Sequence, residues 1–359
     1  MDKVKVGIIG CGGIAFGKHL PSVKSVGLAD LAAVCDLVEE RALKAKKEYG
    51  TEDTKVFTDY RQLLEEKLDA VLVCTPNRSH SVISVDALNA GMHVLCEKPM
   101  AINTAEALKM LDAAKRNGKL LTIGYQSRQK PESRYLKEMC DAGELGEIYF
   151  ARANAVRRRG VPTWGVFLNE YEQGGGALID IGTHALDLTL WLMNNYQPKY
   201  VSGTVYHKLN GDTDQGNPWG KWDPAKFSVE DAAFGFIVME NGATVQLNAS
   251  WALNTLDVKD GQTMLCGTKA GADMMDGLRI NGVKRDRQYV FQPDMTAGGA
   301  AFYEGNANEE PSAAEHRVFM NAVLGKGSLC VLPEQALTVT KILEGIYLSA
   351  ASGKPYFFA

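Results

Sequence analysis

A glycine-rich turn near the start of the chain constrains the fold more than any other feature of its 359 residues. The apolar run 4–9 leads into Gly10-Cys-Gly12-Gly-Ile-Ala15, a G-x-G-x-x-A pattern between a predicted strand and a predicted helix. The first glycine permits a tight turn, the second lets the backbone approach a pyrophosphate, and the small alanine lets helix and strand pack closely. Free N–H groups at the start of the helix then favour an anion. The pattern therefore predicts a dinucleotide-binding turn, with the cofactor lying against Gly10, Gly12, Gly13 and Ile14.

A second apolar run, 31–35, ends in Asp36 and predicts which dinucleotide is bound. An acid about 20 residues past the glycine turn accepts hydrogen bonds from the ribose hydroxyls of NAD. The same carboxylate would repel the 2′-phosphate of NADP, and neither Leu37 nor Val38 offers a group to hold that phosphate. We therefore expect NAD as the cofactor.

The order of strand and helix patterns changes near residue 124. Before it, apolar strands alternate with amphipathic helices such as 38–49 and 104–117, which predicts a parallel, doubly wound sheet of the Rossmann type. After Pro131, strand patterns follow one another without helices between them, which predicts an α+β domain with a large, open, mostly antiparallel sheet. The overall class is thus α/β, with a cofactor-binding domain at 1–124 and a substrate-binding domain at 125–359. The predicted strands are 4–9, 29–35, 54–57, 69–75, 92–96 and 120–124, then 147–157, 199–207, 227–238, 243–252 and 261–267; further helices are predicted at 132–142, 177–193, 312–324 and 333–351.

Composition excludes several classes of function. A net charge of −4 gives no general attraction to nucleic acids or membranes, and no apolar run is long enough to span a bilayer. The seven cysteines are scattered without a C-x-x-C pair, and no spacing typical of a zinc site occurs. No signal-peptide pattern is evident. We therefore expect a cytoplasmic protein without a bound metal.

Two motifs follow neighbouring strands of the predicted parallel sheet, at the edge where such sheets bind ligands. Thr75-Pro-Asn77-Arg-Ser-His80 follows the fourth strand, and Asn77 and His80 could reach the cofactor there; a helix capped by Ser79 is the alternative. Glu97-Lys98-Pro99 follows the fifth strand. Lys98 is suited to relay a proton or hold a substrate hydroxyl, and Glu97 to hold a ribose hydroxyl or orient Lys98, although most lysines are simply solvated.

A third motif lies on a predicted helix after the triplet Gly174-Gly-Gly176. Asp180 and His184 are four residues apart and Asp187 follows three later, so the three side chains share one helix face. Histidine is the side chain best suited to acid–base chemistry near neutral pH, and the acids could orient it or bind hydroxyls. A histidine held in the core remains the alternative.

Taken in order, these motifs resemble those of the Gfo/Idh/MocA family (glucose–fructose oxidoreductase, inositol dehydrogenase and rhizopine catabolism) over nearly the whole chain. The resemblance implies a Rossmann domain followed by an open antiparallel sheet, NAD or NADP, and oxidation of a secondary alcohol of a sugar or cyclitol, or the reverse. It implies that His184 takes the hydroxyl proton, Lys98 holds the same oxygen and Asp180 positions a neighbouring hydroxyl. It further implies a homo-oligomer that covers the open face of the sheet. The expected cofactor contacts beyond the glycine turn and Asp36 are Thr75, Asn77, His80, Glu97, Lys98 and Gln126.

Three further residues help to predict the class of substrate: Arg128, Arg157 and Trp164. We expect them to face the sugar together with Asp180 and His184. An indole suits an apolar sugar face or an aglycone and an arginine suits hydroxyls, although a solvated strand edge would also explain the run 157–159. This stretch is similar to family members that act on glucosides and anhydrosugars, which favours oxidation of the 3-hydroxyl of a glucose unit to a 3-keto sugar. The alternatives are an inositol dehydrogenase, an NAD-dependent redox glycosidase and a non-catalytic NAD sensor. The presence of all three catalytic positions argues against the sensor. The stretch 207–226 is rich in Gly, Asp and Asn and is predicted to be a long loop, either a lid or a surface insertion.

Overall fold

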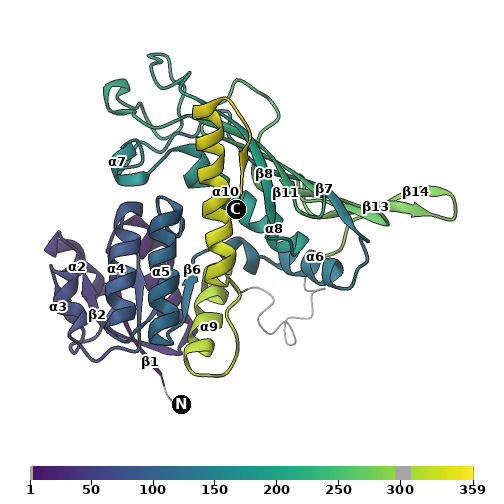
Figure 1. The fold of residues 1–359 in the computed structure, drawn as a ribbon. Coiled ribbons are helices and arrows are strands. Elements are labelled where there is room, and N and C mark those ends of the chain that lie inside the picture. Colours follow the sequence, from purple (N-terminus) through teal and green to yellow (C-terminus); the bar gives the residue numbers. More distant parts are fainter. Residues whose placement is uncertain (1–2, 296–308, 359) are drawn as a thin grey trace. The chain divides into compact units, whose positions relative to one another are not determined.

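The computed structural model describes residues 3–295 and 309–358, which form two compact units (Figure 1). Unit 1 comprises Met1–Gln129 and Glu309–Leu337, and unit 2 comprises Lys130–Asn308 and Thr338–Ala359. The division predicted from the sequence was a single one at residue 124; the contacts place the later segment Glu309–Leu337 in unit 1.

Unit 1 is built on a parallel sheet of six strands in the order β3-β2-β1-β4-β5-β6. Strand order reverses between β1 and β4, which is where doubly wound sheets bind ligands. The predicted Rossmann-type sheet is confirmed. Its strands are β1 (Val4–Ile9), β2 (Ala29–Cys35), β3 (Lys55–Phe57), β4 (Ala70–Val73), β5 (His93–Cys96) and β6 (Leu121–Ile123).

The central strands of this sheet are mostly apolar because helices leave them little contact with water. All four residues of β4 are buried, and β1 exposes only Lys5 among its six residues. The thiols of Cys11, Cys35, Cys74 and Cys96 are buried at strand ends and behave as small apolar side chains. Figure 1 shows α4 and α5 side by side over the sheet. The helices of unit 1 are η1 (Ala15–His19), α1 (Leu20–Val26), α2 (Glu39–Tyr49), α3 (Tyr60–Leu64), α4 (Asn77–Asn89), α5 (Thr104–Asn117), η2 (Gln126–Gln129) and α9 (Pro311–Val323).

Unit 2 is built on a sheet of nine strands in the order β14-β13-β12-β11-β7-β10-β9-β8-β15. All its pairings are antiparallel except that of β7 with β10, so the predicted open, mostly antiparallel sheet is confirmed. The strands are β7 (Ile148–Val156), β8 (Pro198–Tyr206), β9 (Ala232–Met239), β10 (Thr244–Ser250), β11 (Lys259–Gly267), β12 (Ala270–Asp273), β13 (Arg279–Lys284), β14 (Arg287–Phe291) and β15 (Tyr356–Phe357).

One continuous helical segment of unit 2 carries two of the predicted catalytic residues, Asp180 and His184. The π-helical turn η3 (Leu178–Gly182) runs directly into α8 (Thr183–Met193), which packs on β7 and β11. Such π-turns occur mostly at functional sites. The other helices are α6 (Pro131–Asp141), α7 (Glu170–Gln173), η4 (Pro224–Lys226) and α10 (Pro333–Ser352), and the division between the units falls within α10.

Several strands differ from those predicted. The strand predicted at 227–238 begins only at Ala232, because Glu230 and Asp231 have other partners described below. The strands β12, β13, β14 and β15 and the short helix α7 were not predicted. No helix among residues 3–295 and 309–358 is long and apolar enough to cross a membrane, and no cluster of ligand side chains there could hold a metal ion.

Candidate active site

The glycine turn after β1 has the geometry that a dinucleotide requires. Gly10 has φ +93°, and a Cβ there would lie 2.6 Å from the carbonyl oxygen of Cys74, so only glycine fits. A Cβ at Gly12 or at Gly13 would meet nothing within 4 Å. Protein packing therefore does not explain these two glycines, and the space beside them is compatible with the close approach of a pyrophosphate. Ile14 is 44% exposed at the start of the helix.

Asp36 lies at the carboxyl end of β2 with its carboxylate already oriented. Its Oδ2 accepts a hydrogen bond from the N–H of Cys11 at 2.8 Å, and its Oδ1 accepts one from the N–H of Val38 at 2.9 Å. A carboxylate accepts about four hydrogen bonds, so capacity remains for ribose hydroxyls. The side chain thus connects the glycine turn to the position where the adenosine ribose of NAD is expected.

The turn at 75–80 supplies an orphaned polar atom and a buried histidine. The Oγ1 of Thr75 is buried and has no hydrogen-bond partner within the described structure, as expected of a group that binds a ligand. Asn77 begins α4 after Pro76, so the helix is not capped by Ser79. His80 is 1% exposed, and its two ring nitrogens lie 2.8 Å from the oxygen of Pro99 and 2.9 Å from that of Thr75. His80 therefore connects two turns of the protein, which argues against the cofactor contact expected of it.

Glu97 is held by protein groups on both carboxylate oxygens. Its Oε1 lies 2.6 Å from Lys18 Nζ and 2.9 Å from His19 Nε2, and its Oε2 accepts the N–H of Lys98 at 3.1 Å. Burial alone would raise the pKa of Glu97, but the Lys18 ammonium and the His19 hydrogen bond hold that pKa well below its ordinary value. Of the two roles expected of Glu97, orienting Lys98 fits this geometry. Lys98 is half-buried.

Arg128 does not have the surroundings expected of a substrate ligand. Its side chain is fully buried in unit 1, and its Nη1 donates to the oxygen of Cys330 at 2.9 Å and to Oε1 of Gln335 at 2.7 Å. These bonds attach η2 to the segment after α9, so the geometry supports a structural role. Gln126, also on η2, is partly exposed.

In unit 2, Asp180 and His184 are the polar side chains that the run from η3 into α8 leaves partly exposed. Their neighbours from Leu178 to Leu190 are otherwise buried, Asp187 included. The predicted common face of Asp180 and His184 is thus the face that opens outward. The carboxylate Oδ2 of Asp180 accepts the indole N–H of the fully buried Trp251 at 2.9 Å. The sequence offered no signal for this residue, because Trp251 lies 71 positions away just beyond β10.

The glycine triplet before η3 serves close packing. A Cβ at Gly175 would lie 2.2 Å from the hydroxyl of Tyr347, and one at Gly176 would lie 2.1 Å from the carbonyl oxygen of Glu230. The buried carboxylate of Glu230 accepts the N–H groups of Gly176 at 2.7 Å and of Leu178 at 2.9 Å. These bonds satisfy backbone donors at the start of η3, and burial raises the pKa of Glu230. Glu230 and Tyr347 were not foreseen as parts of the site.

The stretch 207–226 contains no strand and is bonded to the segment that follows β7. Asn217 Nδ2 donates to the carbonyl oxygen of Val161 and its Oδ1 accepts the N–H of the same residue, both at 3.0 Å. The rings of Trp164 and Trp219 meet edge to face with centroids 5.1 Å apart, and they remain 52% and 45% exposed. Arg157 stacks on Trp219 at 5.4 Å while its Nε donates to Asp260 at 2.6 Å. Arg157 thus supports an aromatic platform, which we define as Trp164 and Trp219.

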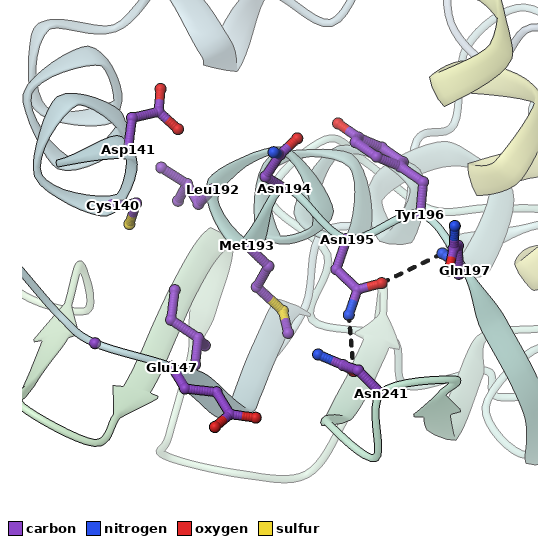
Figure 2. A pocket seen from close by; sticks show the side chains of 12 residues that line it. Cys140, Asp141, Glu147, Leu192, Met193, Asn194, Asn195, Tyr196, Gln197 and Asn241 are labelled. Carbon is purple, nitrogen blue, oxygen red and sulfur yellow. Dashed lines mark hydrogen bonds between the residues drawn. The ribbon is translucent and has the colours of Figure 1, made fainter. Parts of the chain in front are cut away.

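A separate pocket lies at the far end of α8 from His184 (Figure 2). Its lining includes Cys140, Glu147, Met193 and Asn195, and Asn195 Nδ2 donates to Asn241 Oδ1 at 3.0 Å. Since α8 has 11 residues, about 16 Å of helix separates its two ends. This pocket is therefore not part of the candidate active site.

Comparisons with known proteins agree with these features. The profile of the oxidoreductase family with an NAD-binding Rossmann fold matches residues 4–125, and that of the GFO/IDH/MocA C-terminal domain matches residues 133–273. The chain is 34% identical to the D-glucoside 3-dehydrogenase of Escherichia coli (strain K12) over 98% of this chain and 96% of that one. It is 31% identical to the inositol 2-dehydrogenase of Salmonella typhimurium (strain LT2) over 53% of this chain and 55% of the relative. The structure of levoglucosan dehydrogenase in complex with NADH and L-sorbose has the same fold, with a TM-score of 0.82 at 22% identity over 100% of both chains. The chain therefore has an NAD-binding Rossmann domain.

Proposed function

We propose that this chain, which belongs to the Gfo/Idh/MocA family of oxidoreductases, oxidises a secondary hydroxyl of a sugar or glycoside with NAD as the hydride acceptor. The hydroxyl that we propose to be oxidised is the 3-hydroxyl of a glucose unit, and its oxidation gives a 3-keto sugar. The observation that carries this proposal is the similarity to a D-glucoside 3-dehydrogenase over 98% of the chain. The expected catalytic residues Lys98, Asp180 and His184 are all present.

Each of these residues has a role that suits its surroundings. His184, partly exposed among buried neighbours, would take the proton of the reacting hydroxyl. Lys98 would donate a hydrogen bond to the same oxygen and stabilise the negative charge that develops there. Asp180 would accept a hydrogen bond from a neighbouring hydroxyl, because its side chain is partly exposed and Trp251 fixes the orientation of its carboxylate. When bound, NAD supplies the electrophilic nicotinamide ring.

The residues around the glycine turn fit that cofactor. The open space beside Gly12 and Gly13 suits a pyrophosphate, the oriented carboxylate of Asp36 suits ribose hydroxyls, and the orphaned Oγ1 of Thr75 suits a further polar contact. Asp36 would also disfavour a 2′-phosphate. We propose Gly10, Ile14, Asn77, Lys98 and Gln126 as the remaining contacts.

The aromatic platform supports a sugar or a glycoside as substrate. Two half-exposed indoles offer an apolar surface on which a sugar ring or an apolar aglycone can stack. Arg157 has Asp260 and Trp219 as partners, so its proposed part in substrate binding is to hold Trp219 in place.

Two further proposals concern assembly and compartment. Apolar side chains along the large sheet, such as Tyr149, Phe236 and Val290, are 55%, 44% and 71% exposed, which supports a homo-oligomer that covers them. Light scattering after size exclusion tests this, and a monomer would contradict it. The seven cysteines are all free, which supports a reducing cytoplasm.

The experiment that tests the activity follows NADH formation with glucose, methyl and aryl glucosides, galactose and inositols, and then identifies the product. NADH and a 3-keto product from glucosides support the proposal. Turnover confined to inositols would favour a cyclitol dehydrogenase, in line with the inositol 2-dehydrogenase relative. Cleavage of a glycoside without net NADH would indicate a redox glycosidase and overturn the proposal.

A further inference from the structure

Five ionisable side chains meet in the interior of unit 1. Lys18 and His19 come from η1 and Glu97 from the end of β5, while Glu315 and His316 come from α9. None of the five is more than 7% exposed. We call these five residues the buried cluster.

The centre of the buried cluster is an ammonium between two carboxylates. Lys18 Nζ lies 2.6 Å from Oε1 of Glu97 and 2.8 Å from Oε2 of Glu315. Burial alone would lower the pKa of Lys18, but the two carboxylates raise that pKa above its ordinary value, so the ammonium persists. Gly124 leaves the space for this contact, since a Cβ there would lie 3.1 Å from both Glu97 Oε1 and Lys18 Nζ. One cation and two anions leave a net charge of −1.

A row of three contacts extends from Glu97 through both histidines. Glu97 Oε1 lies 2.9 Å from His19 Nε2, His19 Nδ1 lies 3.0 Å from His316 Nε2, and His316 Nδ1 lies 2.7 Å from the carbonyl oxygen of Ser312. Each distance is that of a hydrogen bond, and each bond needs one proton between its two atoms.

Two neutral histidines cannot supply those protons. A neutral imidazole carries one N–H, whereas an ionised carboxylate and a backbone carbonyl only accept. Neutral His19 and His316 therefore offer two protons to three contacts, and one contact would place two lone pairs face to face. A third proton completes the row and makes one histidine an imidazolium.

The charges of the cluster favour the same third proton. It brings the net charge from −1 to zero, and an unbalanced charge without water is costly. Burial opposes the proton because it lowers the pKa of His19 and of His316. The titratable side chains next to the cluster are Cys74, whose thiol burial keeps protonated, His80, whose pKa burial lowers and its two carbonyl contacts raise, and Lys98, which follows Glu97 and carries a positive charge. Within the cluster, the number of hydrogen bonds and the charge balance both favour the third proton, whereas burial opposes it.

We propose that Glu97, His19 and His316 share a third proton at neutral pH, and that the completed row makes Lys18, His19 and His316 positioning residues for Lys98. The connection to Lys98 is short, because Glu97 Oε2 accepts the Lys98 N–H at 3.1 Å. Lys18 and His19 lie on η1, which continues the glycine turn. The cluster therefore fixes both the turn that faces the cofactor and the backbone that carries Lys98. The predicted effect on turnover rests on the proposed function. The presence of the third proton does not depend on that function.

The proton is tested directly by ¹⁵N NMR of the six histidines in the full-length protein, with His19 and His316 assigned from H19Q and H316Q. The expected result at pH 7 is one imidazolium within the pair, protonated on both ring nitrogens. Two neutral tautomers at pH 7 would overturn the proposal.

The charge balance is tested by E315Q, which removes one negative charge with little change in shape. The imidazolium should then titrate at a lower pH than in the wild type. The matched control is E66Q, which removes a carboxylate that lies 2.6 Å from Lys55 at the surface of the same unit, and it should leave the titration unchanged. An equal titration in E315Q and the wild type would contradict the proposal.

The positioning role is tested by comparing H316Q with H316L. The glutamine amide can donate to His19 Nδ1 without a third proton, so H316Q should lose the imidazolium, keep most of kcat and show a pH profile without the titration of the row. Leucine donates nothing, so H316L should lose about tenfold in kcat at nearly constant KM for NAD. Equal kcat in the two variants would overturn the positioning role. Absence of NAD-dependent turnover in the wild type would instead contradict the proposed function and leave the NMR result intact.

Discussion

Two carboxylates, one in each unit, adjoin the proposed catalytic residues and are held in opposite ways. Glu97 in unit 1 precedes Lys98 and is buried against an ammonium and an imidazole. Asp180 in unit 2 lies one helical turn from His184, is partly exposed, and receives one bond from the neutral indole of Trp251. The first arrangement uses both oxygens within the protein. The second fixes the orientation of a carboxylate that stays partly exposed.

This difference supports the proposal that one carboxylate serves the scaffold and the other the substrate. A buried ion pair holds its geometry because breaking it leaves an unpaired charge away from water. An indole N–H fixes orientation at lower cost, since it adds no charge beside the reacting groups. Five variants test the contrast, beginning with the residues that the two carboxylates accompany.

The largest effect is expected when the reacting groups themselves are removed. K98A and H184A should each lower kcat by about 10²- to 10⁴-fold, the range typical of a lost acid–base group. NAD affinity, measured by protein fluorescence, should stay close to that of the wild type. Near-normal kcat in either variant would remove that residue from the mechanism.

The next effect tests the charged carboxylate of unit 1. K18M leaves Glu97 and Glu315 without their cation, so unfolding in denaturant should show a loss of about 3–5 kcal/mol. K55M, which removes the surface partner of Glu66, should cost less than about 1 kcal/mol.

The ion pair of Lys18 and Glu97 also predicts how the stability of the fold depends on pH. Because the pKa of Glu97 is lowered in the folded protein, its contribution to stability is full above its ordinary value of about 4.5 and is lost as the pH falls below that value. K18M should therefore lose less stability than the wild type on acidification. Parallel curves would show that Lys18 does not lower this pKa.

A smaller effect is expected from the neutral contact in unit 2. W251F keeps an aromatic ring but removes the donor to Asp180, and a hydrogen bond to a charged group is worth about 1.5–3 kcal/mol. We expect kcat to fall by about 10- to 100-fold with little change in KM for NAD. The control is W222F, which removes an indole donor to the oxygen of Asn210 in the 207–226 loop. Equal losses in both variants would indicate a general packing defect.

The smallest effect concerns a third carboxylate, which backbone N–H groups hold. D36N keeps the size of Asp36 but removes its charge, so repulsion of a 2′-phosphate should weaken. The preference for NAD over NADP, measured as the ratio of kcat/KM values, should fall by about tenfold, or about 1.4 kcal/mol. An unchanged ratio would exclude Asp36 as the determinant of cofactor choice.

Local patterns in the sequence were enough to predict most of unit 1. Strands 4–9 and 29–35 and the helix 104–117 have the bounds predicted for them, because continuous apolar runs and caps such as Gly118 are local signals. In unit 2 the sequence pattern wrongly predicted a strand at residues 227–231. Apolar and acidic residues there resemble a strand, but Glu230 caps η3 and Asp231 accepts the N–H of Leu209 at 2.6 Å.

The residues that contact the site residues could not be predicted from local sequence patterns. His19 and His316 are 297 positions apart, and Asp180 and Trp251 are 71 apart, so no periodicity relates them. The same holds for Arg128, whose partners lie more than 200 residues later. The sequence therefore predicted which groups carry chemistry, whereas only the folded chain shows which residues Asp180 and Glu97 contact. The positions of Lys98, Asp180 and His184 in the reaction stay predictions.

The place of α9 in unit 1 has a consequence for synthesis on the ribosome. Residues 18, 19 and 97 emerge early, but Glu315 and His316 are translated only after all of β7 to β14. Until then the cofactor-binding half carries Lys18 without Glu315 and His19 without His316. A fragment that ends at Gln129 should therefore resemble this nascent chain, and a cofactor domain cut from this protein for reuse needs the distant segment Glu309–Leu337 attached to it.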